Sequence, residues 1–145
     1  MNTPTITPII GKEFANAVVP LIKRAKKNID IIVFDWRWYP DQIGSEIQRF
    51  NHALIMARRK SVKIRAITNP FRTIAILSKL GIKIKKPITR GLIHTKLMVI
   101  DNKTAILGSH NYTMNAFTIN YEVSVIINEE KSVERLQQYF NNLWQ

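Results

Sequence analysis

The sequence predicts a layered α/β domain with a mixed central β-sheet flanked by helices on both faces. Helical and strand patterns alternate through its first half, while its second half holds a hairpin, a further strand and a last helix. Such alternation is typical of sheets covered by helices on both faces, and hairpins add antiparallel strands. The length of 145 residues suits a single domain over 1–145 with a sizeable core.

The first elements follow from the spacing of apolar residues. Helical spacing across 12–27 predicts a helix, and Pro20 inside it should kink or restart that helix. The apolar run 28–34 predicts a strand. A second helix is expected to begin at Pro40–Asp41. Its predicted buried stripe comprises Ile43, Ile47, Phe50, Leu54 and Ala57.

The later elements follow from alternation and from stop signals. A strand is predicted over 61–68, and a helix from Pro70 that Gly81 ends. The last helix is expected to begin at Asn128, a good cap, with acidic residues in its first turn. The remaining predicted strands are 82–84, 92–101, 104–109 and 121–128.

The charge favours a polyanionic partner, either nucleic acid or an anionic membrane surface. Twenty-two Lys and Arg outnumber ten Asp and Glu, which gives a net charge of +12. The alternative is a solvated basic surface that aids solubility. One basic cluster leads directly toward His94, and we expect it to bind substrate. Its predicted substrate-binding members are Lys83, Lys85, Lys86 and Arg90.

Several classes of protein are disfavoured by composition. Without cysteine the chain has neither disulfides nor thiolate metal sites, and it shows no HxxxH or HExxH spacing, so no metal or cofactor is expected. No apolar run approaches the roughly 20 residues that cross a bilayer, so stable membrane insertion is not expected. The N-terminus lacks the pattern of a signal peptide, which predicts a cytoplasmic protein, or a periplasmic or secreted one if a signal was removed.

The stretch GLIHTKLMVIDNKTAILGSHNYT places polar residues on one face of predicted strands. Alternate strand residues share a face, so His94 and Lys96 point the same way. If residues 102–103 form a two-residue hairpin loop, Lys96 lies opposite Ser109 and His94 lies opposite Asn111. The four side chains would then converge, although a slip of one residue would separate them.

These four side chains suit a phosphate better than a metal cation. Lysine supplies charge, asparagine and serine supply neutral donors, and histidine supplies a nucleophile or a proton carrier. No carboxylate lies among the four. The alternative is a buried histidine beside a lysine whose stem packs at a strand end. Convergence of four polar side chains from two strands favours the site.

The segment HTKLMVIDNKTAILGSHN matches the pattern HxKxxxxDxxxxxxGSxN and thereby resembles the phospholipase D superfamily. The tripeptide at 120–122, NYE, looks like the Asn-x-Glu of that family. Ser61 replaces a frequent glycine before a strand, and the chain has one copy of a motif that many members carry twice. It is most similar to the short bacterial endonuclease branch. The matching positions are His94, Lys96, Asp101, Gly108, Ser109 and Asn111.

The resemblance implies hydrolysis of phosphodiesters in two steps. His94 would attack phosphorus and become a phosphohistidine, while a second histidine protonates the leaving oxygen and then activates water. Lys96 and Asn111 would hold the phosphate, with Ser109 assisting. Glu122 would fix the His94 ring through its other nitrogen. Asp101, another motif residue, faces away by the strand count and is given a structural role.

Other candidate residues are less specific. After the strand 28–34, Trp36 could stack on bases and Arg37 could touch phosphate. The alternative is that this aromatic segment packs at a core edge or a subunit interface. His110 falls on the opposite face from Asn111, and His52 lies within a predicted helix, so both are interpreted as structural or surface residues.

These observations predict a metal-independent nuclease of phospholipase D-like fold, with DNA favoured over RNA as its partner. Because one motif offers one suitable histidine, a homodimer that shares one active site is expected, with residues of 112–120 in its interface. Two alternatives remain. One is a phospholipid phosphodiesterase, and the other is a nucleic-acid-binding protein with an idle motif.

Overall fold

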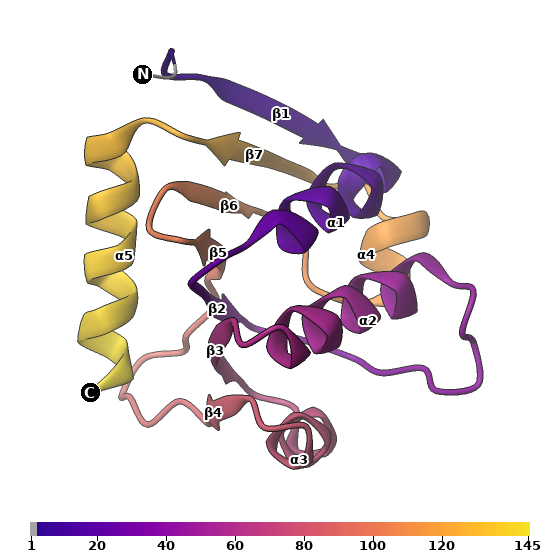
Figure 1. Cartoon of the computed structure of the whole chain (residues 1–145). Helices are drawn as coiled ribbons and strands as arrows, with labels where there is room; N and C mark the ends of the chain where they lie inside the picture. The colour runs from indigo at the N-terminus through magenta and orange to yellow at the C-terminus, as the bar shows by residue number, and fades with distance from the viewer. Residues whose placement is uncertain (1–2) are drawn as a thin grey trace.

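The computed structural model describes residues 3–145, which form a seven-stranded mixed sheet with helices on both faces (Figure 1). Strands β2, β3 and β4 pair in parallel, and all other neighbours are antiparallel. The strand order is β1-β7-β6-β5-β2-β3-β4. The strands are β1 Ile6–Ile10, β2 Asn28–Val33, β3 Lys63–Thr68, β4 Lys83–Lys85, β5 Lys96–Ile100, β6 Thr104–Gly108 and β7 Val123–Ile127.

Helices α1 and α2 lie on one side of the sheet, and α5 lies on the other (Figure 1). No helix within residues 3–145 is both long enough and apolar enough to cross a bilayer. The helices are the short 3₁₀ helix η1 Gly11–Glu13, α1 Phe14–Arg24, α2 Glu46–Arg59, α3 Phe71–Lys79, α4 Met114–Thr118 and α5 Glu130–Trp144.

The central strand β2 feeds both layers of the core because its side chains alternate between the two faces. Ile29 and Ile31 belong to the apolar cluster that includes the buried residues of α1 and α2. Ile32 belongs to a second cluster that contains Val133 and Phe140 of α5. The predicted α/β class, with a mixed sheet between helices, is confirmed.

Buried Asp30 joins α5 to the sheet. Its carboxylate accepts two hydrogen bonds from Arg65, each 2.8 Å long, and one of 2.8 Å from Gln137 Nε2 on α5. The Asp30 hydrogen bond raises the pKa of Arg65, although burial opposes it. The Arg65 guanidinium also lies 4.9 Å from the centre of the Phe140 ring. Charge and packing together therefore fix the position of α5, which supplies one wall of the site described below.

The predicted restart of the first helix at Pro20 and the predicted start of the second helix were wrong. Helix α1 runs unbroken through Pro20, which lies on its exposed side together with Asn16, so water can bond the carbonyl that loses its amide partner. Helix α2 begins at Glu46, not at Pro40–Asp41, because the Ser45 hydroxyl caps it by accepting from the Gln48 amide at 3.3 Å. Ile43 is consequently 82% exposed in the preceding loop.

The two ends of the chain also differ from expectation. Strand β1 was not predicted, and it forms one edge of the sheet by pairing with β7. Asn128 does not cap α5, because its Oδ1 accepts from the Thr5 amide beside β1. Glu129 takes the capping role and accepts from the amides of Lys131 and Ser132. The helix α4 was likewise not predicted.

Candidate active site

The hairpin between β5 and β6 has a different register from the one predicted. Asp101 and Asn102 both adopt positive φ, 54° and 53°, and the Lys103 amide donates to the Ile100 carbonyl at 3.0 Å. Two successive residues of positive φ form the tight hairpin turn, so the loop spans 101–103 rather than 102–103. Ile100 therefore pairs with Thr104, and continuing this register places Gly108, not Ser109, opposite Lys96.

Strand β6 makes a close contact with β7 at Gly108, just before Ser109 and Asn111. A Cβ atom at Gly108 would lie 2.4 Å from the Cα atom of Ser124 and from the carbonyl oxygen of Val123, so only glycine fits here. Strand β6 ends at this residue. Beyond it the Ser109 amide donates to the Val123 carbonyl at 2.9 Å, while His110 turns into the core.

His94, Lys96, Ser109 and Asn111 line one open hollow of about 790 Å³. The hollow lies where β5 and β7 begin and β6 ends. Among residues 3–145, no three His, Cys, Asp or Glu side chains are grouped as a metal site would require. The other residues that line the hollow are Thr95, Leu97, Leu107, Gly108, Glu122, Leu136 and Tyr139.

His94 precedes β5 instead of lying within it, and its exposed side chain contacts Lys96. Lys96 Nζ lies 2.9 Å from His94 Nδ1 and 2.7 Å from the His94 carbonyl oxygen. Phe34, which follows β2, packs against the imidazole with 4.8 Å between ring centres. Burial lowers the pKa of Lys96, and nearby Glu122 partly opposes this effect. A bound anion would raise that pKa again and favour the ammonium form.

Glu122 bonds to Ser109 and not to His94 in the single chain. One carboxylate oxygen accepts from Ser109 Oγ at 2.6 Å, and the other accepts from Asn120 Nδ2 at 3.2 Å. Ser109 Oγ in turn accepts from the Val123 amide at 3.0 Å. The predicted contact between Glu122 and the His94 ring is therefore absent from the single chain, although both side chains line the hollow.

Asn111 is held by its oxygen, which leaves its amide nitrogen for a ligand. Asn111 Oδ1 accepts from the Asp35 amide at 3.1 Å. Among residues 3–145, no acceptor is hydrogen-bonded to Asn111 Nδ2. With the ammonium of Lys96, the hollow thus offers a charged donor and a neutral donor, both suited to the non-bridging oxygens of a phosphodiester.

Asp101 lies at the far end of β5 from the hollow and has a structural role. Its carboxylate accepts from the backbone amides of Lys26, Lys27 and Asn28 at 2.9, 2.7 and 3.0 Å. Burial raises the pKa of Asp101, but these three amides and the charge of Lys103 outweigh it, so the pKa lies below its usual value. The carboxylate therefore stabilises the connection that enters β2.

Asp101→Asn is expected to lower the free energy of unfolding by about 1–2 kcal/mol, because one acceptor oxygen becomes a donor at a partly exposed site. A folded-state pKa below the unfolded value stabilises above the unfolded pKa, and this stability disappears as pH falls through the folded pKa. The difference from wild type should therefore shrink below about pH 4. Urea unfolding at several pH values measures it.

Asp41→Asn is the matched control, since Asp41 is exposed in a loop and bonds to no group within residues 3–145. It should leave stability unchanged at every pH. Equal stabilities of Asp101→Asn and wild type at neutral pH would contradict the structural role of Asp101.

Trp36 is a core residue, so the expectation that it stacks on bases was wrong. Its side chain is fully buried, its Nε1–H donates to Asn51 Oδ1 at 2.8 Å, and its ring packs edge-on against Tyr112. Arg37 is exposed and forms an ion pair of 2.7 Å with Asp35. Arg37 lines a neighbouring hollow that shares Asn111 with the first, which keeps it beside the candidate site.

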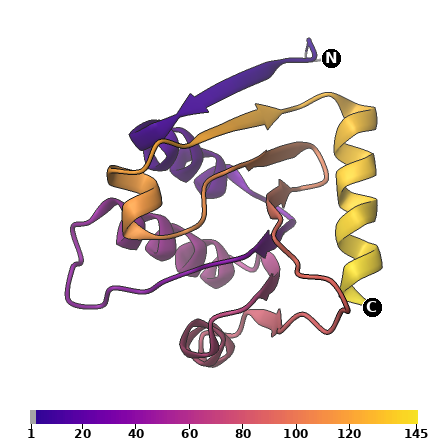
Figure 2. The ribbon, with the colours of Figure 1, turned by 180° about the vertical axis from the view of Figure 1, so that it is seen from behind.

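The basic cluster predicted to bind substrate does not line the hollow. Lys83 lies on β4, and Lys85 Nζ donates to the Trp144 carbonyl oxygen at 2.5 Å. Lys86 and Arg90 are exposed in the loop from β4 to β5, which passes beside the C-terminal end of α5 (Figure 2). Strand β4 forms the edge of the sheet farthest from β7. Only the loop from β4 to β5 therefore brings basic residues of this cluster toward the hollow.

Sequence reasoning did not single out Phe34, which packs against the His94 ring. It also missed Leu136 and Tyr139 of α5, which line the hollow. The Tyr139 hydroxyl lies 2.9 Å from Thr95 Oγ1, next to His94. Leu136 recurs at helical spacing with Val133 and Phe140, but nothing in the sequence linked it to a segment 40 residues earlier.

The other two histidines are poorly placed for chemistry in this hollow. His110 is buried and bonds to Ser124 Oγ and to the Gly11 carbonyl oxygen, which holds η1 against β7. Burial lowers the pKa of His110, and its bond to Gly11 partly opposes this. His52 is exposed on α2 and lines a different hollow.

Comparison with known proteins identifies similar sequences. Residues 18–144 match the family described as "Cardiolipin synthase, PLD-like domain". A mitochondrial cardiolipin hydrolase of Xenopus laevis is 30% identical over 144 residues, which cover 95% of this chain and 64% of that protein. A phospholipase D of Rickettsia prowazekii is 28% identical over 86% of this chain and 60% of its own length. The chain thus spans less than two thirds of these relatives.

Two solved structures share the fold along nearly their whole length. NucT from Helicobacter pylori superposes with a TM-score of 0.81 at 20% identity, over 98% of this chain and 96% of its own. Nuc from Salmonella typhimurium, described as a phospholipase D family member, also gives 0.81, at 24% identity, over 98% and 95%. At these identities the likeness concerns the fold.

Proposed function

The chain belongs to the phospholipase D superfamily, and from that premise we propose that it is a metal-independent phosphodiesterase that cleaves nucleic acid through His94. The observation that carries this proposal is the contact between His94 and Lys96 in an open hollow that Ser109 and Asn111 also line. A nucleophile, a cation and neutral donors then surround one position where a phosphodiester fits.

In the first step an unprotonated nitrogen of His94 attacks phosphorus and forms an N–P bond. The bond from phosphorus to the leaving oxygen breaks, and that oxygen takes a proton from a second histidine. In the second step water gives a proton to that histidine and attacks phosphorus, which breaks the N–P bond and frees His94. Lys96 Nζ and Asn111 Nδ2 stabilise the charge on the non-bridging oxygens throughout.

The charge of the chain supports nucleic acid as the substrate. A net charge of +12 attracts a polyanion over long distance, and Arg37, Lys86 and Arg90 are exposed on segments that adjoin the hollow. NucT and Nuc share the fold, although fold alone does not define a substrate.

A phospholipid is the second candidate substrate, supported by two observations. The matching family and the Xenopus relative carry cardiolipin in their names. In this chain, Ile88 and Leu92 are 97% and 70% exposed in the loop that precedes His94, where they would suit a lipid surface. Incubation with labelled DNA, labelled RNA and cardiolipin-containing vesicles separates the candidates. Cleavage of vesicle lipid alone would overturn the nucleic-acid proposal.

The second histidine is proposed to come from another copy of the chain. Within one chain His110 is buried and His52 lies elsewhere, so neither can protonate the leaving oxygen. Ile119, Tyr121 and Val123 flank Glu122 and are 69%, 104% and 55% exposed. Exposed apolar side chains next to the hollow favour a twofold dimer through this surface, with the two His94 side chains facing one shared phosphate.

Excess EDTA is expected to leave cleavage of labelled DNA unchanged, because Lys96 and Asn111 supply the charge and donors that a divalent ion supplies elsewhere. A magnesium-dependent nuclease in the same buffer serves as the control for chelation. Complete loss of cleavage in EDTA, with recovery on adding magnesium, would exclude this mechanism.

A further inference from the structure

A second basic hollow lies at the end of the sheet opposite to the His94 site. It encloses about 880 Å³. We infer that this basic hollow binds the phosphate backbone of a nucleic acid independently of the His94 site; the choice of ligand rests on the proposed function. Its cationic residues are Lys26, Lys27, Arg58, Lys63, Arg65 and Lys83.

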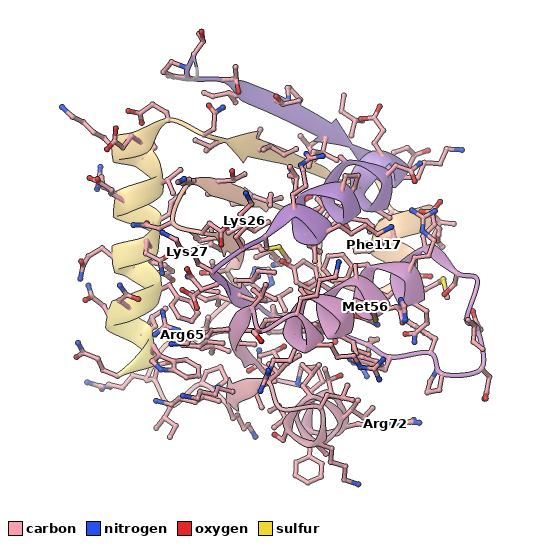
Figure 3. All side chains as sticks on the ribbon, in the orientation of Figure 1. Lys26, Lys27, Met56, Arg65, Arg72 and Phe117 are labelled. Carbon is pink, nitrogen blue, oxygen red and sulfur yellow. The ribbon has the colours of Figure 1, made fainter. Side chains whose placement is uncertain are left out.

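The topology brings these cations together from four separate segments. Lys26 and Lys27 join α1 to β2, and the Lys63 amide donates to the Lys27 carbonyl at 3.0 Å. Arg65 is aligned with Lys83 on the neighbouring strand β4. Figure 3 labels Lys26, Lys27 and Arg65, which lie at one end of the sheet between α1 and α5. Side chains on adjacent strands or at alternate positions stand about 5–7 Å apart, so the cations form an array.

Most of this charge has no counter-ion in the chain. Arg65 is paired with Asp30, and Arg58 Nε donates to the Gly81 carbonyl oxygen at 3.0 Å. The carboxylate oxygens of Asp101, which adjoins this segment, accept hydrogen bonds from backbone amides and not from the lysine side chains. Four lysine ammonium groups of the hollow form no hydrogen bond and no ion pair within residues 3–145. They belong to Lys26, Lys27, Lys63 and Lys83.

Compensation of helix dipoles does not explain these four lysines. The C-terminal ends of α1, α2 and α3 do point toward this end of the sheet, and cations stabilise helix C-termini. However, the last turns already hold basic residues of their own, namely Arg24, Arg58 and Lys79 among others. The four lysines lie beyond those turns, on the connection into β2 and on strands, where the effect of the dipole has faded.

A polynucleotide suits this hollow better than a membrane surface. Proteins that bind lipid interfaces combine cations with exposed apolar anchors. No large exposed apolar residue of the described chain lines the basic hollow, because its apolar members Val62 and Ile64 are buried. Nucleic acid instead presents one negative charge per 3.4 Å or so along each strand, which matches an array of cations without anchors.

The distance between the two sites sets the kind of ligand that can use both. Lys96 begins β5 at the His94 site, and Asp101, just past the end of β5, contacts the backbone of Lys26 and Lys27. Five strand steps span about 16 Å. A single phosphodiester therefore reaches only one site, whereas a polynucleotide of many nucleotides can reach both. Affinity should consequently increase with substrate length.

The test replaces the four lysines, Lys26, Lys27, Lys63 and Lys83, by glutamine. Binding of a labelled 30-nucleotide DNA is measured by fluorescence anisotropy at several salt concentrations, with His94→Ala added to every protein to prevent cleavage. The log–log salt slope is expected to flatten by about 3, since each lost contact removes roughly 0.7–0.9. The matched control replaces four exposed cations on η1, α3 and α5 by glutamine, and its slope should change by less than 1. These are Lys12, Arg72, Lys131 and Arg135.

Equal flattening in both variants would show that only net charge matters and would overturn the inference. Loss of binding to anionic vesicles, with DNA binding retained, would identify a lipid surface and overturn it too. Hydrolysis of bis(4-nitrophenyl) phosphate by the four-lysine variant that keeps His94 should equal wild type, since that small ester reaches one site. If the protein cleaves no nucleic acid but its DNA binding still depends on the four lysines, the proposed function fails and this inference stands.

Discussion

Replacing His94 by alanine is expected to reduce phosphodiester cleavage on the order of 10³-fold or more, because the covalent intermediate can no longer form. Nucleic-acid binding should remain close to wild type, since the basic surface is unchanged. Cleavage of labelled DNA measures the first effect, and fluorescence anisotropy measures the second. Rapid acid quenching of wild type with substrate should trap a phosphorylated peptide that contains His94.

His52→Ala is the matched control for this variant. His52 is an exposed histidine on α2 that lines a different hollow, so its loss should leave turnover unchanged. His110→Ala is unsuitable, because His110 is buried and holds η1 to β7. Near-normal turnover of a folded His94→Ala protein would show that the motif is idle and would favour the non-catalytic binding protein.

Replacing Tyr121 by glutamate is expected to yield an inactive monomer, because a charged side chain would enter the proposed apolar interface. Tyr121 is fully exposed next to Glu122, so the folded chain itself should tolerate the change. Light scattering should give about twice 16.8 kDa for wild type and 16.8 kDa for the variant. Turnover should be lost together with dimerisation, since each shared site needs a histidine from both chains.

Phe71→Glu provides the comparison, because Phe71 is 83% exposed on α3, away from the His94 hollow. It should remain dimeric and active. Mixing His94→Ala with Lys96→Ala protomers should not restore full activity, since every mixed site still lacks one histidine and one lysine. A wild-type monomer that turns over at working concentration would refute the shared site and would require a proton carrier within one chain.

The sequence by itself determined the features that depend on near neighbours. An apolar run identified the buried strand β2, alternation identified β3, and helical spacing identified the helix that corresponds to α1. The motif from His94 to Asn111 sufficed to identify the superfamily, because its residues are close in the chain and its spacing is specific. These signals are local, so no knowledge of distant contacts was needed.

Only the tertiary structure decided the details that depend on distant segments. The turn at Asp101 and Asn102 shifted the register by one residue, yet Ser109 and Asn111 still line one hollow with Lys96 beyond the close contact of Gly108 with Ser124. Neither effect can be counted along one strand, because each depends on how β6 meets its neighbours.

Burial and charge placement were decided in the same way. The position of Trp36 in the sequence allowed the interpretation that it stacks on bases. However, its contacts with Tyr112 and its hydrogen bond to Asn51 place it in the core. Lys83 precedes the motif in sequence yet gathers with Lys26 and Lys63 at the opposite end of the sheet. Residues that are close in sequence need not be neighbours in the fold. In a seven-stranded sheet, spatial neighbours depend on the order and direction of the strands, and no single segment of the sequence encodes these.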